Sequence, residues 1–145
     1  MKNNIMKESN IKIKLIDEHD YRFLYNLLKE RDPKTNISHH KMPSYSEHLK
    51  FIKSKPYSKW YIIFDNRKKV GSVYLTKMNE IGIFLKKETQ KKGIGKYVLK
   101  QIFEKNPRKR YLANVSPNNL VSQNFFKKNG FHLIQYTYEL IPGEI

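Results

Sequence analysis

A basic, glycine-containing loop between a predicted strand and a predicted helix constrains the fold more than any other feature. Ile81, Ile83 and Leu85 alternate with other residues, a pattern typical of a short buried strand. The loop at residues 90–95 then reads Gln-Lys-Lys-Gly-Ile-Gly, and apolar residues recur at helical spacing over residues 94–102. The chain must therefore place a helix directly after a strand of its sheet.

This arrangement predicts an anion site. The first N–H groups of a helix lack backbone acceptors, and the helix dipole is positive at that end. Gly93 and Gly95 carry no Cβ that would keep a phosphate away, and Lys91, Lys92 and Lys96 add positive charge. The sequence therefore predicts that the loop binds a phosphate group.

Two common phosphate-binding motifs do not fit this loop. A P-loop requires Ser or Thr after its lysine, and Tyr97 follows Lys96 here. A dinucleotide fingerprint requires a third glycine at position 98, which is Val98. The loop instead resembles the Gln/Arg-x-x-Gly-x-Gly/Ala signature of the GCN5-related N-acetyltransferases (GNAT family), which binds the pyrophosphate of acetyl-CoA.

A second segment strengthens this resemblance. Asn119, Ser122, Phe126, Gly130 and Phe131 stand at the spacing of the family's later Asn-x-x-Ala/Ser-x-x-x-Tyr-x-x-x-Gly-Phe element. The resemblance covers about residues 11–140 and implies acetyl-CoA as co-substrate. It also implies the residues that contact acetyl-CoA. These are Ile83, Phe84, Leu85, Lys91, Lys92, Gly93, Ile94, Gly95, Lys96, Asn119 and Ser122.

The remaining hydrophobic pattern predicts one α/β (α+β) domain over residues 11–145, after a flexible N-terminus at residues 1–10. We expect a mixed, mostly antiparallel sheet with splayed parallel central strands and about four helices. The expected strands are residues 11–15, 60–64, 70–75, 81–85, 110–115, 131–133 and 135–140. Helices are expected from Tyr21 to before Pro33, after Ser44 or Ser46, from Ile94 to Ile102, and between Asn119 and Gly130.

Composition narrows the function classes. The 145 residues contain no cysteine, so an acyl-enzyme on sulfur and a thiolate metal site are excluded. The net charge of +16 comes almost entirely from lysines spread along the chain, which favours steering of anionic substrates over nucleic-acid binding. We predict no metal and no membrane partner, and a soluble cytoplasmic protein. The sequence leaves open whether it is a monomer or a homodimer.

The resemblance implies direct transfer of an acetyl group from acetyl-CoA to a primary amine, but two usual proton-handling positions differ. Phe126 replaces the tyrosine that commonly protonates the thiolate, and Asn114 replaces a glutamate base found in some relatives. We therefore consider Glu80, His39 and His40 as candidate catalytic residues. Tyr74 is expected to pack in the sheet. Glu47 and His48 are expected to form an exposed pair on a helix.

The acceptor is less constrained. A set of scattered positions resembles GNAT enzymes that acetylate nucleotide-linked amino sugars. These positions are residues 36–40, 47–48, 51, 60–63, 71–74 and 80–83. Protein or peptide N-acetylation is the alternative acceptor class. A catalytically silent acetyl-CoA-binding module and a basic nucleic-acid-binding domain are the competing types of protein.

Overall fold

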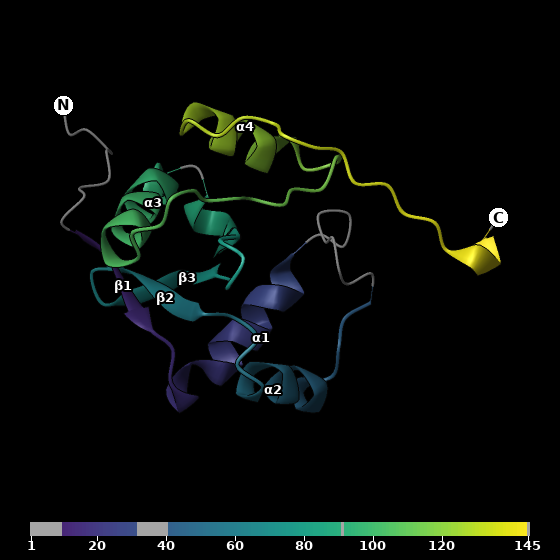
Figure 1. The fold of residues 1–145 in the computed structure, drawn as a ribbon. Helices are drawn as coiled ribbons and strands as arrows, with labels where there is room; N and C mark the ends of the chain where they lie inside the picture. Colours follow the sequence, from purple (N-terminus) through teal and green to yellow (C-terminus); the bar gives the residue numbers. More distant parts are fainter. Residues whose placement is uncertain (1–9, 32–40, 91, 145) are drawn as a thin grey trace.

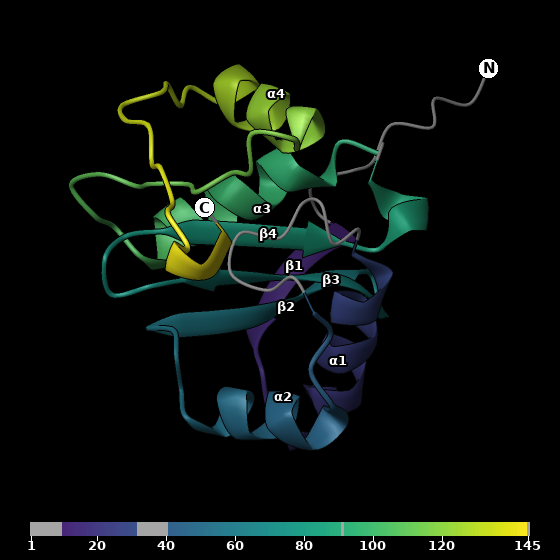
Figure 2. The same ribbon diagram turned by 90° about the vertical axis from the view of Figure 1, so that its right-hand side faces the viewer.

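The computed structural model describes residues 10–31, 41–90 and 92–144, and a four-stranded antiparallel sheet forms its centre (Figure 1). The strands follow chain order: β1 (Ile11–Leu15), β2 (Lys59–Asp65), β3 (Lys68–Leu75) and β4 (Ile81–Leu85). The α-helices are α1 (Tyr21–Glu30), α2 (Tyr45–Lys53), α3 (Ile94–Lys105) and α4 (Leu120–Lys128). Figure 2 shows α1 and α2 on one side of the sheet and α3 and α4 on the other. The expected α+β class and the four helices are confirmed.

Strand alternation divides the core into two layers. Ile63 and Val98 belong to the larger layer, which lies between the sheet and α3. Ile62, the neighbour of Ile63, points to the opposite side and packs with Leu24 of α1 and Ile52 of α2. Because successive side chains of a strand face opposite ways, one continuous apolar run in β2 serves both layers.

Helix α2 begins with a complete capping box. The Ser44 hydroxyl accepts a hydrogen bond from the Glu47 N–H at 3.1 Å, and the Glu47 carboxylate accepts one from the Ser44 N–H at 2.9 Å. Hydrogen bonds from Ser44 hold the pKa of Glu47 below its ordinary value. Of the two predicted caps, Ser44 is therefore the residue that starts this helix.

A glutamine side chain covers the outer edge of β1. The Gln101 side chain in α3 accepts from the Ile13 N–H at 3.2 Å and donates to the Ile11 carbonyl at 2.5 Å. Strand β1 pairs with β2 along its other edge. The amide of Gln101 thus pairs with backbone groups of an edge strand and joins α3 to the sheet.

The expected parallel strand at residues 110–115 is not formed. This segment touches β4 at one isolated parallel bridge, Glu80 to Leu112, where the Ile81 N–H donates to the Leu112 carbonyl at 2.7 Å. Beyond that bridge the segment diverges from β4, because a cavity lies between them. The parallel splay of the predicted fold class is therefore not shown, and the four described strands are all antiparallel.

The predicted strands at residues 131–133 and 135–140 are also absent. This segment leads away from α4 without regular structure (Figure 1), and Tyr136 and Tyr138 are 75% and 90% exposed. A strand requires a neighbour for its backbone hydrogen bonds. Within residues 92–144 no such strand is present, so the alternating pattern alone does not produce one.

We expect the Gln101→Leu substitution to lower the free energy of unfolding by about 1–2 kcal/mol, because it leaves two partly buried backbone groups without their amide partner. Urea denaturation followed by circular dichroism measures this change. The control is Gln135→Leu at an exposed site, which should change stability by less than about 0.5 kcal/mol. Equal effects of the two substitutions would contradict the proposed role of Gln101.

Candidate active site

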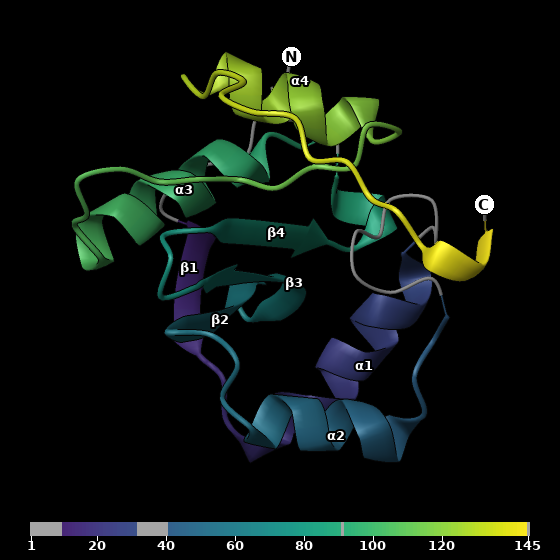
Figure 3. The same ribbon diagram turned by 45° about the vertical axis from the view of Figure 1, so that its right-hand side comes forward.

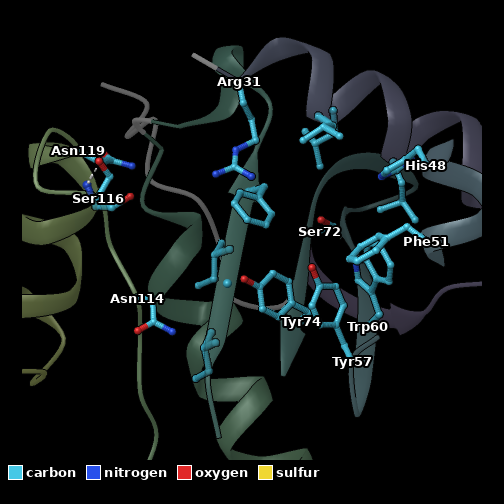
Figure 4. Close-up of a pocket in the computed structure, with 18 of the residues that line it drawn as sticks. Arg31, His48, Phe51, Tyr57, Trp60, Ser72, Tyr74, Asn114, Ser116 and Asn119 are labelled. Carbon is cyan, nitrogen blue, oxygen red and sulfur yellow. Dashed lines mark hydrogen bonds between the residues drawn. The ribbon is translucent and has the colours of Figure 1, made fainter. Parts of the chain in front are cut away.

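A cavity of about 540 Å³ opens between β4 and the segment that follows Leu112 (Figure 4). Helices α1 and α2 contribute one wall, and α4 contributes the other. The residues of β4 that line it are Ile81, Gly82, Ile83 and Phe84, and those opposite are Asn114, Val115, Ser116, Asn119, Ser122 and Phe126. The cavity therefore lies between the strand that precedes the glycine loop and the second sequence motif.

The backbone edge of β4 faces this cavity. On its other edge β4 pairs with β3, where Phe84 is opposite Ser72 and Leu85 is opposite Gly71. On the cavity side, the protein pairs β4 only at its start, through Ile81 and Leu112, among the described residues. An extended ligand with amide groups can therefore lie along Ile83 to Leu85.

The glycine loop ends in the turn that opens α3. Gly93 is the N-cap of α3 and has a φ of 73°, and a Cβ added there would meet no atom within 4 Å. Lys92 and Lys96 are exposed beside it. This open, basic helix N-terminus has the features of a phosphate site.

Two residues of the loop also have a packing role. A Cβ on Gly95 would lie 2.4 Å from the Phe125 ring, so Gly95 is required for packing of α3 against α4. The Ile94 side chain is fully buried in the core. Only the backbone N–H groups of these residues can contribute to a phosphate site.

The second motif places Asn119 and Ser122 on the opposite wall of the cavity. Asn119 is the N-cap of α4, and its side-chain oxygen accepts a hydrogen bond from the Ser122 N–H at 3.1 Å. Phe126 is buried and also lines the cavity. Its ring fills the position of the family's usual tyrosine but cannot donate a proton.

Aromatic side chains line the cavity on the α2 side. The rings of Tyr57 and Tyr74 stack with centroids 3.9 Å apart and an interplanar angle of 5°. Trp60 meets Tyr57 edge to face at 4.7 Å, and Phe51 meets Trp60 at 6.2 Å. We call Phe51, Tyr57, Trp60 and Tyr74 the aromatic wall.

Gly82 makes room for this wall. A Cβ at Gly82 would lie 2.3 Å from atoms of the Tyr74 ring. The Tyr74 side chain therefore rests directly on β4, next to the strand edge that faces the cavity. Burial raises the pKa of Tyr57 and of Tyr74, so both phenols stay protonated at neutral pH and can donate hydrogen bonds.

The predicted exposed position of His48 is wrong. It was expected on an exposed helix face with Glu47, but it is only 7% exposed and lines the cavity. Its ring lies 5.6 Å from that of Tyr25 and 6.3 Å from that of Phe51. The helical pattern of α2 leaves His48 on the same side as Phe51 and Ile52, and that side packs toward α1 and the sheet.

Arg31 lines the cavity, and its side chain is half-buried. Its guanidinium carbon lies 3.9 Å from the centroid of the Phe84 ring. Burial lowers the pKa of Arg31, while the nearby Tyr74 and Tyr57 act in the opposite direction. The side chain still carries its positive charge at neutral pH, because an arginine does not lose its proton in proteins.

Glu80 joins β4 to the opposite wall. One carboxylate oxygen accepts from the Thr76 hydroxyl at 3.0 Å, and the other accepts a short hydrogen bond from the Asn114 side chain. Glu80 also lies close enough to Tyr74 to raise the pKa of that phenol. Of the three predicted catalytic residues, His39 and His40 lie outside the described residues, as does Lys91 of the loop.

Sequence reasoning missed Arg31 and Tyr57. Arg31 follows the last residue of α1, where a cation is favoured by the helix dipole alone, so its position carried no functional signal. Tyr57 lies in a short loop after α2, and only the fold stacks it on Tyr74. Within the described residues, no cluster of three or more His, Asp or Glu side chains suited to a metal is present.

Comparison with known proteins defines the family. The chain matches the model of the Acetyltransferase (GNAT) family over residues 21–131. Comparison with individual curated proteins gives no match. None of the helices in the described ranges has the length and apolar character needed to span a membrane.

Three solved structures share the fold. A domain from Methanocaldococcus jannaschii has a TM-score of 0.77 and 24% identity, covering 89% of this chain and 92% of its own. The ribosomal L7/L12 alpha-N-protein acetyltransferase RimL, in complex with coenzyme A, has a TM-score of 0.71 and 18% identity over 90% and 85%. Spermidine N-acetyltransferase from Vibrio cholerae, in complex with CoA and spermine, has a TM-score of 0.71 and 17% identity over 90% and 88%.

The family match covers most of the chain, and the glycine loop, the second motif and the cavity between β4 and the second motif agree with it. The chain belongs to the GNAT acetyltransferase family and is an acetyl-CoA-dependent N-acetyltransferase.

Proposed function

We propose that the protein acetylates the primary amine of a nucleotide-linked amino sugar. The observation that carries this proposal is the continuity of the cavity, which joins the open edge of β4 to an aromatic wall and a half-buried cation. Stacked aromatic rings suit the flat or apolar faces of a base and a sugar. The guanidinium of Arg31 suits a phosphate.

A protein or peptide amine is the second candidate acceptor. The RimL structure, that of a ribosomal L7/L12 alpha-N-protein acetyltransferase, supports this alternative at the level of the fold. The spermidine acetyltransferase adds polyamines as a third class to test. Phe126 and Asn114 replace the usual proton-handling residues, so other groups must handle the protons.

The residues present fit acetyl-CoA, which supplies a thioester as the acetyl donor. The backbone of Ile83 to Leu85 would bind the amides of its pantetheine arm, and the N–H groups around Gly93 would bind its pyrophosphate. Lys91, Lys92 and Lys96 would add charge, and Asn119 and Ser122 would support the far side of the arm. A backbone N–H of β4 would stabilise negative charge on the carbonyl oxygen.

The protein must also move two protons. The amine loses a proton as its nitrogen forms a bond to the carbonyl carbon, the carbon–sulfur bond breaks, and the departing thiolate gains a proton. The Glu80 carboxylate precedes β4 and accepts hydrogen bonds from Thr76 and from Asn114 of the cavity wall. We propose that it accepts the amine proton through water, with His39 and His40 as further candidates.

We expect Gly93→Asp to abolish acetyl-CoA binding in calorimetry, because it brings a negative charge to the phosphate site. The matched control is Gly93→Asn, which has the same shape and the same left-handed backbone strain without the charge. It should retain most of the affinity. Equal affinity of the aspartate variant and the wild type would contradict the assignment of the loop.

We expect Glu80→Gln to lower kcat on the order of 10²-fold, the usual contribution of a general base, while the Kd for acetyl-CoA changes less than about twofold. Thr76→Val is the control, because it removes one partner of the carboxylate but keeps the carboxylate. A similar loss in both variants would show that Glu80 has a structural role.

Thiol release from acetyl-CoA tests the acceptor class. A cysteine-free protein contributes no thiol of its own to the assay. We expect release with a nucleotide-linked amino sugar and little release with N-terminal peptides or spermidine. Release with peptides alone would replace the proposed acceptor by the second candidate.

A further inference from the structure

We propose that Arg31, Tyr57 and Tyr74 form an anion subsite that binds a phosphate or carboxylate group of the acceptor. The acceptor amine would then lie on the Glu80 side of Tyr74. This inference rests on the proposed function, and it predicts that the substrate carries a negative group in addition to its amine.

The first argument is the situation of Arg31. In the described part of the chain, no carboxylate forms an ion pair with its guanidinium, and its close contact is the ring of Phe84 at 3.9 Å. A charged group that is largely removed from water is costly unless an opposite charge or hydrogen bonds compensate it. A ligand anion would supply that compensation.

The second argument is that three hydrogen-bond donors face one space. The guanidinium lies close enough to both phenols to influence them electrostatically, and Figure 4 shows it pointing toward the space beside Tyr74. Two protonated hydroxyls and a planar guanidinium all donate hydrogen bonds. Three donors that face one space are suited to the oxygens of a phosphate or a carboxylate.

The third argument is the face of the sheet on which Arg31 lies. Phe84 and Gly82 face α1 and α2, whereas Ile81, Ile83 and Leu85 pack toward α3, which carries the phosphate loop. Figure 3 shows α1 and α3 on opposite sides of β4. Arg31 is therefore separated from the loop at Gly93, which favours the acceptor over the pyrophosphate as its partner.

The fourth argument is the charge of the lining. Among the described lining residues, Glu47 is the single carboxylate, and it caps α2 through the Ser44 N–H. The lining cations are Arg31 and Lys41. A polyamine carries several positive charges and would meet the buried guanidinium, so this lining opposes it and favours an acceptor with an anionic group.

The test is a set of matched acceptors and three variants. The acceptor pairs are an amino sugar with and without a uridine diphosphate, and lysine against cadaverine, with spermidine as a third arm. Arg31→Met removes the charge at similar volume, Arg31→Lys keeps it, and Lys41→Met removes the more exposed lining cation as a control. Thermal melting verifies that each variant is folded.

We expect Arg31→Met to raise the KM of the anionic acceptor roughly 10- to 100-fold, as loss of charged hydrogen bonds should. The lysine variant should give a smaller increase, and Lys41→Met should change KM less than about threefold. The Kd for acetyl-CoA and the KM of the anion-free amine should stay unchanged. Whether the diphosphate or the carboxylate pair shows the larger effect identifies the anion.

Two results would overturn the subsite. One is a loss of acetyl-CoA affinity in Arg31→Met equal to the loss in acceptor KM, because the guanidinium would then serve the co-substrate. The other is a wild-type preference for spermidine or for the anion-free amines.

Failure of the proposed function is distinguishable from failure of the subsite. A wild type that binds acetyl-CoA but acetylates none of these amines contradicts the proposed function alone. Calorimetry with uridine diphosphate and with succinate then tests the subsite directly. Binding that is lost in Arg31→Met supports it, and binding that is equal in both proteins, or absent from the wild type, overturns it.

Discussion

The alternation of side chains along β4 organises this protein. Ile81, Ile83 and Leu85 anchor the strand to the core against α3, while Gly82 and Phe84 lie on the opposite face, toward α1 and α2. The backbone edge between these two rows is the surface on which an extended ligand can lie. Core packing therefore sets the position of the site, since β4 cannot shift without disturbing the layer that α3 covers.

Gly82 shows how tightly the two sides are connected. Only the absence of a Cβ allows the ring of Tyr74 from β3 to rest on β4. Tyr74 in turn stacks on Tyr57, which meets Trp60, so one glycine determines the position of a whole aromatic surface. Packing of β3 on β4 thus shapes this part of the cavity.

Charge is distributed on two scales. The net charge of +16 lies mostly on exposed lysines and acts at long range on any anionic substrate. Arg31 and Glu80 act at short range, on either side of Tyr74, and each influences the pKa of that phenol in the opposite direction. A molecule with one positive and one negative group would match this polarity, whereas the surface charge alone would not distinguish it from other anions.

Local sequence patterns predicted the parts of the fold that depend on local interactions. The strand at residues 81–85, the helix at Gly93 and the capping residue Ser44 follow from periodicity and from helix-end chemistry. The predicted parallel strand at residues 110–115 is not formed. Strand formation depends on a neighbouring strand, and the cavity separates this segment from β4.

The predictions for the two sides of the candidate site rest on different signals. Gly93 and Asn119 belong to contiguous motifs, so their spacing could be read directly. Phe51, Trp60 and Tyr74 of the aromatic wall stand at scattered positions that the sequence also singled out. Arg31 and Tyr57 join them only when α1 and α2 pack on the sheet, and no spacing in the sequence encodes that contact.

The two edges of the sheet are protected from other proteins in different ways. At β1, the amide of Gln101 occupies the backbone groups of Ile11 and Ile13, so an approaching strand finds the middle of that edge already paired. At β4, the walls of the cavity enclose the edge. A substitution that widened the groove between β4 and residues 114–116 would therefore expose a sheet edge. The variant protein would then self-associate and be poorly soluble.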